Sequence, residues 1–139
     1  MSFLLDTNVV SESIKPHPNP GLTAWLEEFD EDRTFLSVIT LTELRYGIDR
    51  LPVGKRRNRL EEWATNDLPV RFEGRILPVD SAAADRCGRI IARSEAIGRR
   101  MEVMDAFIAA TAVIHRLIVV THNVSDFESI LKDVLDPWT

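Results

Sequence analysis

The chain has 139 residues, of which 45% are hydrophobic and 28% are charged, and its formal net charge at pH 7 is -5. This length and composition exclude a disordered chain and a pair of ordinary domains, so we expect one globular domain over residues 1–139. A single cysteine excludes an internal disulfide, and no stretch has the apolar length of a membrane span. We therefore expect a cytoplasmic protein that does not bind a membrane.

The first half of the chain predicts two strands and four helices. An apolar run at residues 2–5 predicts a buried strand, which ends in the polar turn Asp6-Thr7-Asn8. The other expected elements are helices over 8–14 and 21–29 around a proline-rich loop, a strand at 34–38, a helix over 39–51, and an arginine-rich helix that starts at Lys55 and ends near residues 66–69.

The second half continues the alternation of strands and helices. The expected elements are a strand at 75–79, a long helix from Asp80 or Ser81 to Gly98, an apolar helix over 104–115, a strand at 117–120, a short helix over 125–132 and a possible edge strand near 134–138. Short apolar strands that alternate with helices favour parallel pairing through right-handed crossovers. The prediction is a three-layer α/β/α sandwich with a mainly parallel central sheet of four to five strands.

Three acidic residues follow predicted strands and a fourth, Asp105, opens the apolar helix, so that all four could project at the edge where open parallel sheets carry their functional sites. The four are Asp6, Glu43, Asp105 and Asp126. Carboxylates that gather among apolar neighbours need a compensating charge, and hard divalent cations such as Mg²⁺ or Mn²⁺ prefer oxygen ligands. Bound to such a cluster, a cation favours hydrolytic phosphoryl transfer.

Each acid also has an ordinary structural interpretation. Asp6 is typical of an Asx-turn after a strand, and Thr40 with Glu43 matches a helix capping box. Asp105 and Asp126 each suit the positive end of a helix dipole. Among the histidines, His122 is the candidate for contact with a substrate.

Four segments occur in a recognisable order. They are FLLDTNVVSE at 3–12, SVITLTEL at 37–44, MDAFIAA at 104–110 and VTHNVSDF at 120–127. Together they resemble the PIN-domain ribonucleases, and within that superfamily the VapC toxins of toxin–antitoxin pairs, in particular the FitB-like branch.

The resemblance implies a PIN-like fold and a Mg²⁺- or Mn²⁺-dependent endoribonuclease that is usually a homodimer and is held inactive by a cognate VapB-like antitoxin. By position, Asp6, Asp105 and Glu43 would be metal ligands, and Asp126 would complete the catalytic acids. Asn123 competes with Asp126 for the fourth position. The residues expected to orient the ligands or water are Thr7, Asn8, Thr121 and Asn123.

The charges are distributed unevenly, and the basic part of the chain is a candidate contact surface. Residues 44–100 contain thirteen basic and eight acidic side chains, whereas the rest contains four basic and fourteen acidic ones. The arginines expected to contact either RNA phosphates or an acidic antitoxin segment are Arg45, Arg50, Arg56 and Arg57. Solvated helix faces are the alternative explanation.

Two other functions remain open at the level of sequence. An aspartyl-phosphate phosphohydrolase would use Asp6 as its nucleophile, although such enzymes place a second aspartate where Asn8 stands. A catalytically weak PIN module would bind an antitoxin or nucleic acid without cleaving RNA.

Overall fold

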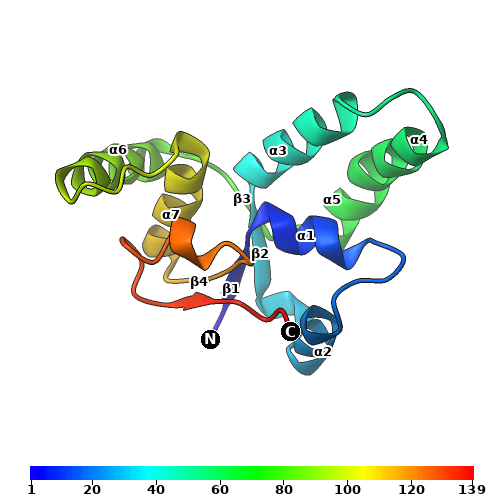
Figure 1. The fold of residues 1–139 in the computed structure, drawn as a ribbon, viewed down its shortest axis with the longest axis horizontal. Helices are drawn as coiled ribbons and strands as arrows, with labels where there is room; N and C mark the ends of the chain where they lie inside the picture. The colour runs from blue at the N-terminus through cyan, green and yellow to red at the C-terminus, as the bar shows by residue number, and fades with distance from the viewer.

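The computed structural model describes residues 1–139 and is built on one five-stranded sheet, with helices on both of its faces (Figure 1). The strands are β1 (Phe3–Leu5), β2 (Thr34–Ser37), β3 (Ile76–Leu77), β4 (Ile118–Val120) and β5 (Val134–Leu135). Their order across the sheet is β3-β2-β1-β4-β5, and every neighbouring pair is parallel. The predicted α/β/α sandwich is therefore confirmed, with β1 at its centre.

The helices connect and cover these strands. They are α1 (Thr7–Ser13), α2 (Pro20–Glu28), α3 (Val38–Asp49), α4 (Lys55–Glu62), α5 (Leu68–Arg71), α6 (Ser81–Ala96) and α7 (Val103–His115). Short 3-10 turns occupy Glu31–Arg33 and Val124–Asp126, and a π-helical turn at Trp63–Asp67 joins α4 to α5. No helix combines the length and the apolar composition needed to cross a bilayer.

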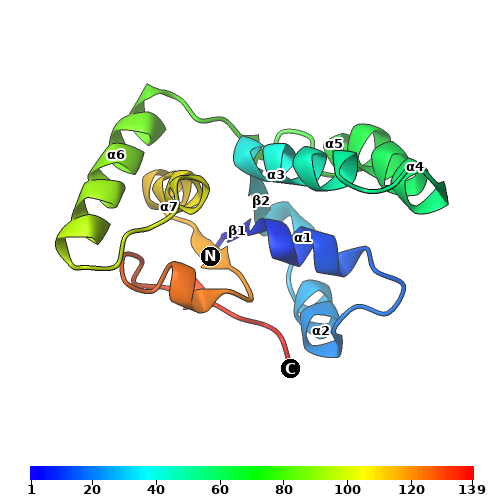
Figure 2. The same cartoon turned by 45° about the horizontal axis from the view of Figure 1, so that its top comes forward.

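Two apolar cores lie on opposite faces of the sheet, because successive side chains of β1 point in opposite directions. Phe3 and Leu5 pack with residues of α1, α2, α3 and α5. Leu4 packs on the other face with residues of α6 and α7. Figure 2 shows α6 and α7 on one side of the strands and α1 to α5 on the other. All three β1 side chains are almost fully buried.

The structure corrects two of the predicted helices. The helix expected over 125–132 is only the 3-10 turn Val124–Asp126 followed by hydrogen-bonded turns, because the fully buried Phe127 draws this segment onto the α6–α7 core. The arginine-rich helix also does not end at Pro69. Helical geometry continues through the π turn into α5. Pro69 lies in the first turn of α5, where its lack of a backbone N–H is tolerated because first-turn N–H groups have no acceptor within the helix.

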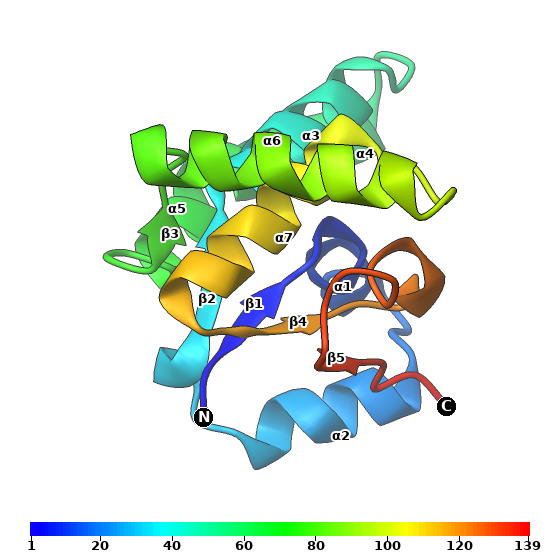
Figure 3. The same ribbon diagram turned by 90° about the vertical axis from the view of Figure 1, so that its left-hand side faces the viewer.

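The end of the chain lies at the β5 edge of the sheet. Strand β5 pairs with β4, and the last residues then pass close to α2, as Figure 3 shows. Since all strands are parallel, the segments after β1, β2 and β4 leave the sheet at the same edge. This edge contains the predicted functional residues.

Candidate active site

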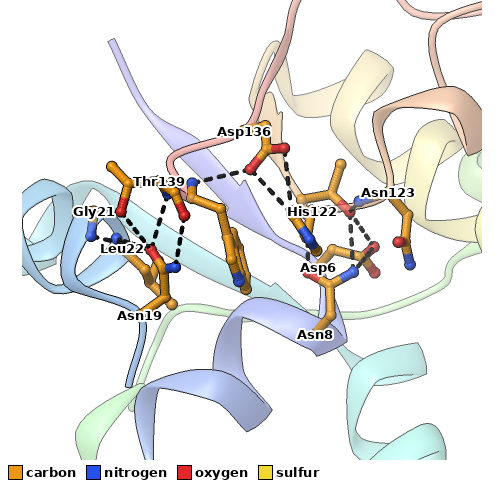
Figure 4. Close-up of polar contacts among 11 residues, drawn as sticks. Asp6, Asn8, Asn19, Gly21, Leu22, His122, Asn123, Asp136 and Thr139 are labelled. Carbon is orange, nitrogen blue, oxygen red and sulfur yellow. Dashed lines mark hydrogen bonds and ion pairs between the residues drawn. The ribbon is translucent and has the colours of Figure 1, made fainter. Parts of the chain in front are cut away.

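Asp6 lies where β1 passes into α1, and it is the most buried of the predicted acids, with 5% of its surface exposed. Its Oδ1 accepts a hydrogen bond from the backbone N–H of Thr7 at 2.8 Å, which makes Asp6 the N-cap of α1. Its Oδ2 accepts from Asn8 Nδ2 at 3.1 Å and from Thr121 Oγ1 at 2.8 Å. Donors from three residues therefore fix the orientation of this carboxylate, and Figure 4 shows one of them, Asn8, beside Asp6.

Glu43 lies on α3 and is held by a threonine of α1. The Thr7 hydroxyl donates to Glu43 Oε1 at 2.6 Å, and the buried Thr40 hydroxyl lies 3.1 Å from Thr7 Oγ1. The capping-box interpretation of Thr40 and Glu43 is wrong, because the N-cap of α3 is Ser37, whose hydroxyl accepts from Ile39 N at 3.0 Å. The carboxylate of Glu43 is thus free of a capping role and contacts α1 instead.

Asp105 and Asp126 come from the other side of the sheet. Asp105 is half-buried in the first turn of α7, and Asp126 is exposed in the 3-10 turn that follows β4. Burial and then the charges of Asp6, Asp126, Glu43 and Glu102 raise the pKa of Asp105 to about 7. Asp105 therefore lies within electrostatic range of all three other predicted acids.

The pKa values of Asp6 and Glu43 are also raised. Burial raises the pKa of Asp6, against hydrogen bonds from Thr121 and Thr7, and the charge of Asp126 raises it further. Burial also raises the pKa of Glu43, where the Thr7 hydrogen bond opposes it and the charge of Asp6 adds to it. None of the four acids is in an ion pair with a basic residue of the chain. Their mutual repulsion is not neutralised by the protein itself.

The donor set suits a hard divalent cation, because it consists of carboxylate oxygens with no thiolate or imidazole among them. No three acidic, histidine or cysteine side chains stand in an arrangement that would hold an ion as they are placed. Burial and the charges of neighbouring acids nevertheless raise the pKa values of Asp6, Glu43 and Asp105. A cation among them would remove the cause of the repulsion.

The segment after β4 surrounds Asp6 with polar groups. Thr121 Oγ1, which donates to Asp6, accepts hydrogen bonds from Asn8 Nδ2 at 3.1 Å and from the backbone N–H of Asn123 at 3.0 Å. Asn8 and Thr121 thus contact Asp6 directly, whereas Asn123 contributes a backbone group to this network. Of the two candidates for the fourth position, Asp126 raises the pKa values of both Asp6 and Asp105, but it is solvent-exposed, as is Asn123.

A groove of about 950 Å³ extends from this cluster between α1, α3 and α4. Thr7 and Glu43 belong to both the groove and the acidic cluster. The apolar lining residues are Ile14, Leu44, Ile48, Leu51, Leu60 and Trp63, and basic side chains come from Lys15, Arg56 and Arg59. The groove therefore combines an apolar lining with positive charge and reaches the acidic cluster at Glu43.

Of the four arginines predicted as contact residues, only Arg56 lines this groove. Arg45 is paired with Glu61 and lies 3.6 Å from Asp49, and the Arg50 guanidinium lies over the Tyr46 ring at 5.0 Å. Arg57 donates to the backbone carbonyl of Leu51 at 3.4 Å.

Lys15, Thr40 and Arg59 are among the groove or acidic-cluster residues that were absent from the predicted set. Arg59 could have been found from its spacing, since it lies one helical turn after Arg56. Lys15 and Thr40 carry no comparable signal in the sequence, because the tertiary packing alone brings them to the groove and to Thr7.

The sequence and the fold were compared with those of known proteins. The family model that describes the PIN domain matches residues 3–130 of this chain. The chain is 36% identical to the VapC ribonuclease Y4jK of Sinorhizobium fredii over 136 residues, which are 98% of this chain and 97% of that protein.

Two solved structures extend the similarity to three dimensions. The crystal structure of FitAcB from Neisseria gonorrhoeae superposes with a TM-score of 0.90 at 38% identity, covering 98% of both chains. A toxin-antitoxin complex from Klebsiella pneumoniae gives a TM-score of 0.74 at 25% identity, covering 99% of this chain and 98% of that one.

Proposed function

The chain belongs to the PIN domain family, and from that premise we propose that it is a cytoplasmic endoribonuclease, the toxin of a toxin–antitoxin pair, which depends on Mg²⁺ or Mn²⁺. The observation that carries the proposal is that Asp6, Glu43 and Asp105, which come from three elements, lie within electrostatic range of one another, where the pKa of each is raised and no basic residue forms an ion pair with it. Phosphodiester hydrolysis at such a site needs a cation, since the pocket alone would repel the RNA backbone.

Asp6, Asp105 and Glu43 would hold the cation, which supplies the positive charge that polarises the scissile phosphate and makes water a stronger nucleophile. The protein's own contribution is orientation. Asn8 and Thr121 donate to the Asp6 oxygen that Thr7 N–H leaves free. The Thr7 hydroxyl holds Glu43 toward the same pocket. Outer groups of this kind keep ligands in the reactive geometry before the substrate arrives.

Asp126 supports the proposal as the fourth acid. Its charge contributes to the raised pKa values of Asp6 and Asp105, so Asp126 shares their electrostatic field although it is exposed. Asn123 cannot contribute a negative charge, and it serves better as a backbone donor to Thr121. We assign the fourth position to Asp126.

The groove next to the pocket suits a segment of the cognate, VapB-like antitoxin. Its apolar lining fits the apolar face of a helix, and Lys15, Arg56 and Arg59 fit acidic side chains along the rim. A segment bound there would end at Thr7 and Glu43 and would block access of RNA to the acids. The similarity to a toxin-antitoxin complex agrees with this assignment.

A homodimer is part of the proposal. Ile97, Val103 and Met104 lie between α6 and α7 or at the start of α7, and they expose 50%, 43% and 41% of their surface. Apolar side chains concentrated in one segment favour an interface with a second copy. The segment also precedes Asp105, so a partner would flank the pocket.

The phosphohydrolase alternative is disfavoured by the surroundings of Asp6. Asn8, at the position where such enzymes need an acid, donates to Asp6 and cannot supply a proton to a leaving group.

The test is cleavage of single-stranded RNA by the purified chain after treatment with EDTA, with and without added Mg²⁺ or Mn²⁺. We expect cleavage only with the cation, and a loss of at least about a hundredfold in Asp6→Asn and Asp105→Asn, because each removes a charged ligand. Asp133→Asn is the matched control, since Asp133 is an exposed aspartate near the C-terminus with no ion pair.

Cleavage in EDTA, or full activity in either pocket variant, would contradict the proposed mechanism. RNA binding without turnover in every metal tested would favour the catalytically weak module. Trapping of phosphate on Asp6 from an aryl phosphate would favour the phosphohydrolase instead.

A further inference from the structure

The last four residues of the chain, Asp136–Thr139, form a structure that we call the C-terminal clamp, and it contacts the loop after β4. The Trp138 and His122 rings are stacked, with centroids 4.6 Å apart and an interplanar angle of 20°. The Asp136 carboxylate lies 3.3 Å from His122 Nδ1 and also accepts from the Trp138 backbone N–H at 3.0 Å. His122 is therefore held on one ring face and at one ring nitrogen, although 53% of its side chain is exposed (Figure 4).

The far end of the clamp is anchored to the start of α2. Thr139 N–H donates to Asn19 Oδ1 at 3.1 Å, and Asn19 Nδ2 donates to the Thr139 carbonyl at 3.1 Å. The chain end also passes so close to Gly21 that a Cβ there would lie 2.5 Å from the Pro137 carbonyl oxygen. These contacts join residues 120 positions apart in the sequence. The clamp is therefore held by tertiary contacts and is an integral part of the fold.

A continuous path of hydrogen bonds leads from His122 to Asp6. The backbone N–H of His122 donates to Asn8 Oδ1 at 3.1 Å, and Asn8 Nδ2 donates to Asp6 Oδ2 at 3.1 Å. Because an amide presents an acceptor at one end and donors at the other, the N–H of His122 determines which end faces the carboxylate. A reversed amide would place two acceptors against each other at Asp6.

We propose that the clamp positions the catalytic carboxylate. Asp136 and Trp138 hold His122, the main chain of His122 orients the Asn8 amide, and Asn8 orients Asp6. This inference rests on the proposed nuclease function, and it makes His122 a positioning residue that acts through its backbone. Stacking on Trp138 is the contact that a ring without nitrogen can keep, and the contact of Asp136 with Nδ1 adds to it.

The decisive comparison is between two substitutions of His122. His122→Phe keeps a ring for stacking, whereas His122→Ala removes it, and neither changes the backbone N–H. We expect His122→Ala and Trp138→Ala to lower kcat by about ten- to a hundredfold with KM unchanged, as for other groups that orient a ligand. His122→Phe and Trp138→Phe should stay within about threefold of the parent chain. Asp133→Ala is the control, because Asp133 lies directly before β5, is exposed and forms no ion pair.

A second readout is independent of catalysis. The side-chain amide resonances of Asn8, measured by NMR in the metal-free protein, should move in His122→Ala and Trp138→Ala and stay in place in the two Phe variants. Mn²⁺ affinity, measured by electron paramagnetic resonance, should fall in the same two Ala variants. Thermal unfolding identifies any variant that loses its fold. His122→Ala should remain folded even if Trp138→Ala does not, because 53% of the His122 side chain is exposed.

The outcomes separate this inference from the nuclease assignment. Equal loss of kcat in His122→Phe and His122→Ala would overturn it, because the imidazole would then act chemically. Unchanged Asn8 resonances and parental kcat in Trp138→Ala would overturn it as well. If the parent chain cleaves no RNA under any metal, the proposed function fails, and the Asn8 resonances and Mn²⁺ affinity still decide whether the clamp orients Asp6.

Discussion

Replacing Asp105 by asparagine should make the metal-free protein more stable while it abolishes activity. The charged carboxylate is unfavourable in the folded state, because burial and the neighbouring acids raise its pKa from 3.8 to about 7. Asparagine has nearly the same shape and carries no charge, so it removes the repulsion from Asp6, Asp126 and Glu43. The residue that the proposed function needs is thus expected to cost folding stability.

The size of the gain follows from the pKa shift. A shift of this size corresponds to a ceiling of about 4 kcal/mol, since each pKa unit is worth about 1.4 kcal/mol. Asp105 is only half-buried, and solvent screening weakens its interactions. We therefore expect a gain of about 1–2 kcal/mol at pH 8, which is a rise in Tm of roughly 3–8 °C for a chain of this size.

The pH dependence gives the sign of the effect. Below about pH 4 the carboxyl group is protonated in both the folded and unfolded chain, so the parent and Asp105→Asn should be equally stable. As the pH rises from 4 to 7, the unfolded chain releases the proton first, and the parent loses stability relative to the variant. Above about pH 7 the difference should be constant.

Calorimetric unfolding in EDTA at several pH values measures this difference, with Asp133→Asn as the control that should match the parent. Added Mg²⁺ should raise the Tm of the parent and have little effect on Asp105→Asn, because only the parent binds the cation well. A variant that is no more stable at pH 8, or a difference that is the same at pH 4 and pH 8, would refute the electrostatic explanation.

Two further substitutions test the surroundings of the pocket. Thr7→Val removes the hydrogen bond that lowers the pKa of Glu43, so that pKa should rise further and Mn²⁺ affinity should fall by about tenfold near neutral pH, measured by titration; an unchanged affinity would argue against Glu43 as a ligand. Gly21→Ala places a Cβ against the chain end and should destabilise the protein by about 1–3 kcal/mol and speed removal of the last residues by carboxypeptidase. Parental stability and digestion of Gly21→Ala would show that the chain end does not pack there.

The sequence alone determines the order of the elements and the place of the acids. The short apolar runs at β1 and β4 are typical of strands that are buried on both faces of a parallel sheet. Parallel pairing then brings the residues that follow these strands to one edge. Asp6 and the Thr121–Asn123 segment were therefore predictable as neighbours, although 115 positions separate Asp6 from Thr121. The reason is topological, because it does not depend on any particular side-chain contact.

Only the tertiary structure decides which side chains are free to act. Arg45 and Arg56 look alike in the sequence, but Arg45 is paired with Glu61, whereas Arg56 lines the groove. The capping box expected at Thr40 and Glu43 does not form, because α3 begins earlier and Ser37 is its N-cap residue. The clamp on His122 depends on contacts between Trp138 and the loop after β4, which local patterns cannot specify. Such contacts depend on packing between distant segments. They form, and stabilise the protein, only after the sheet has brought those segments together.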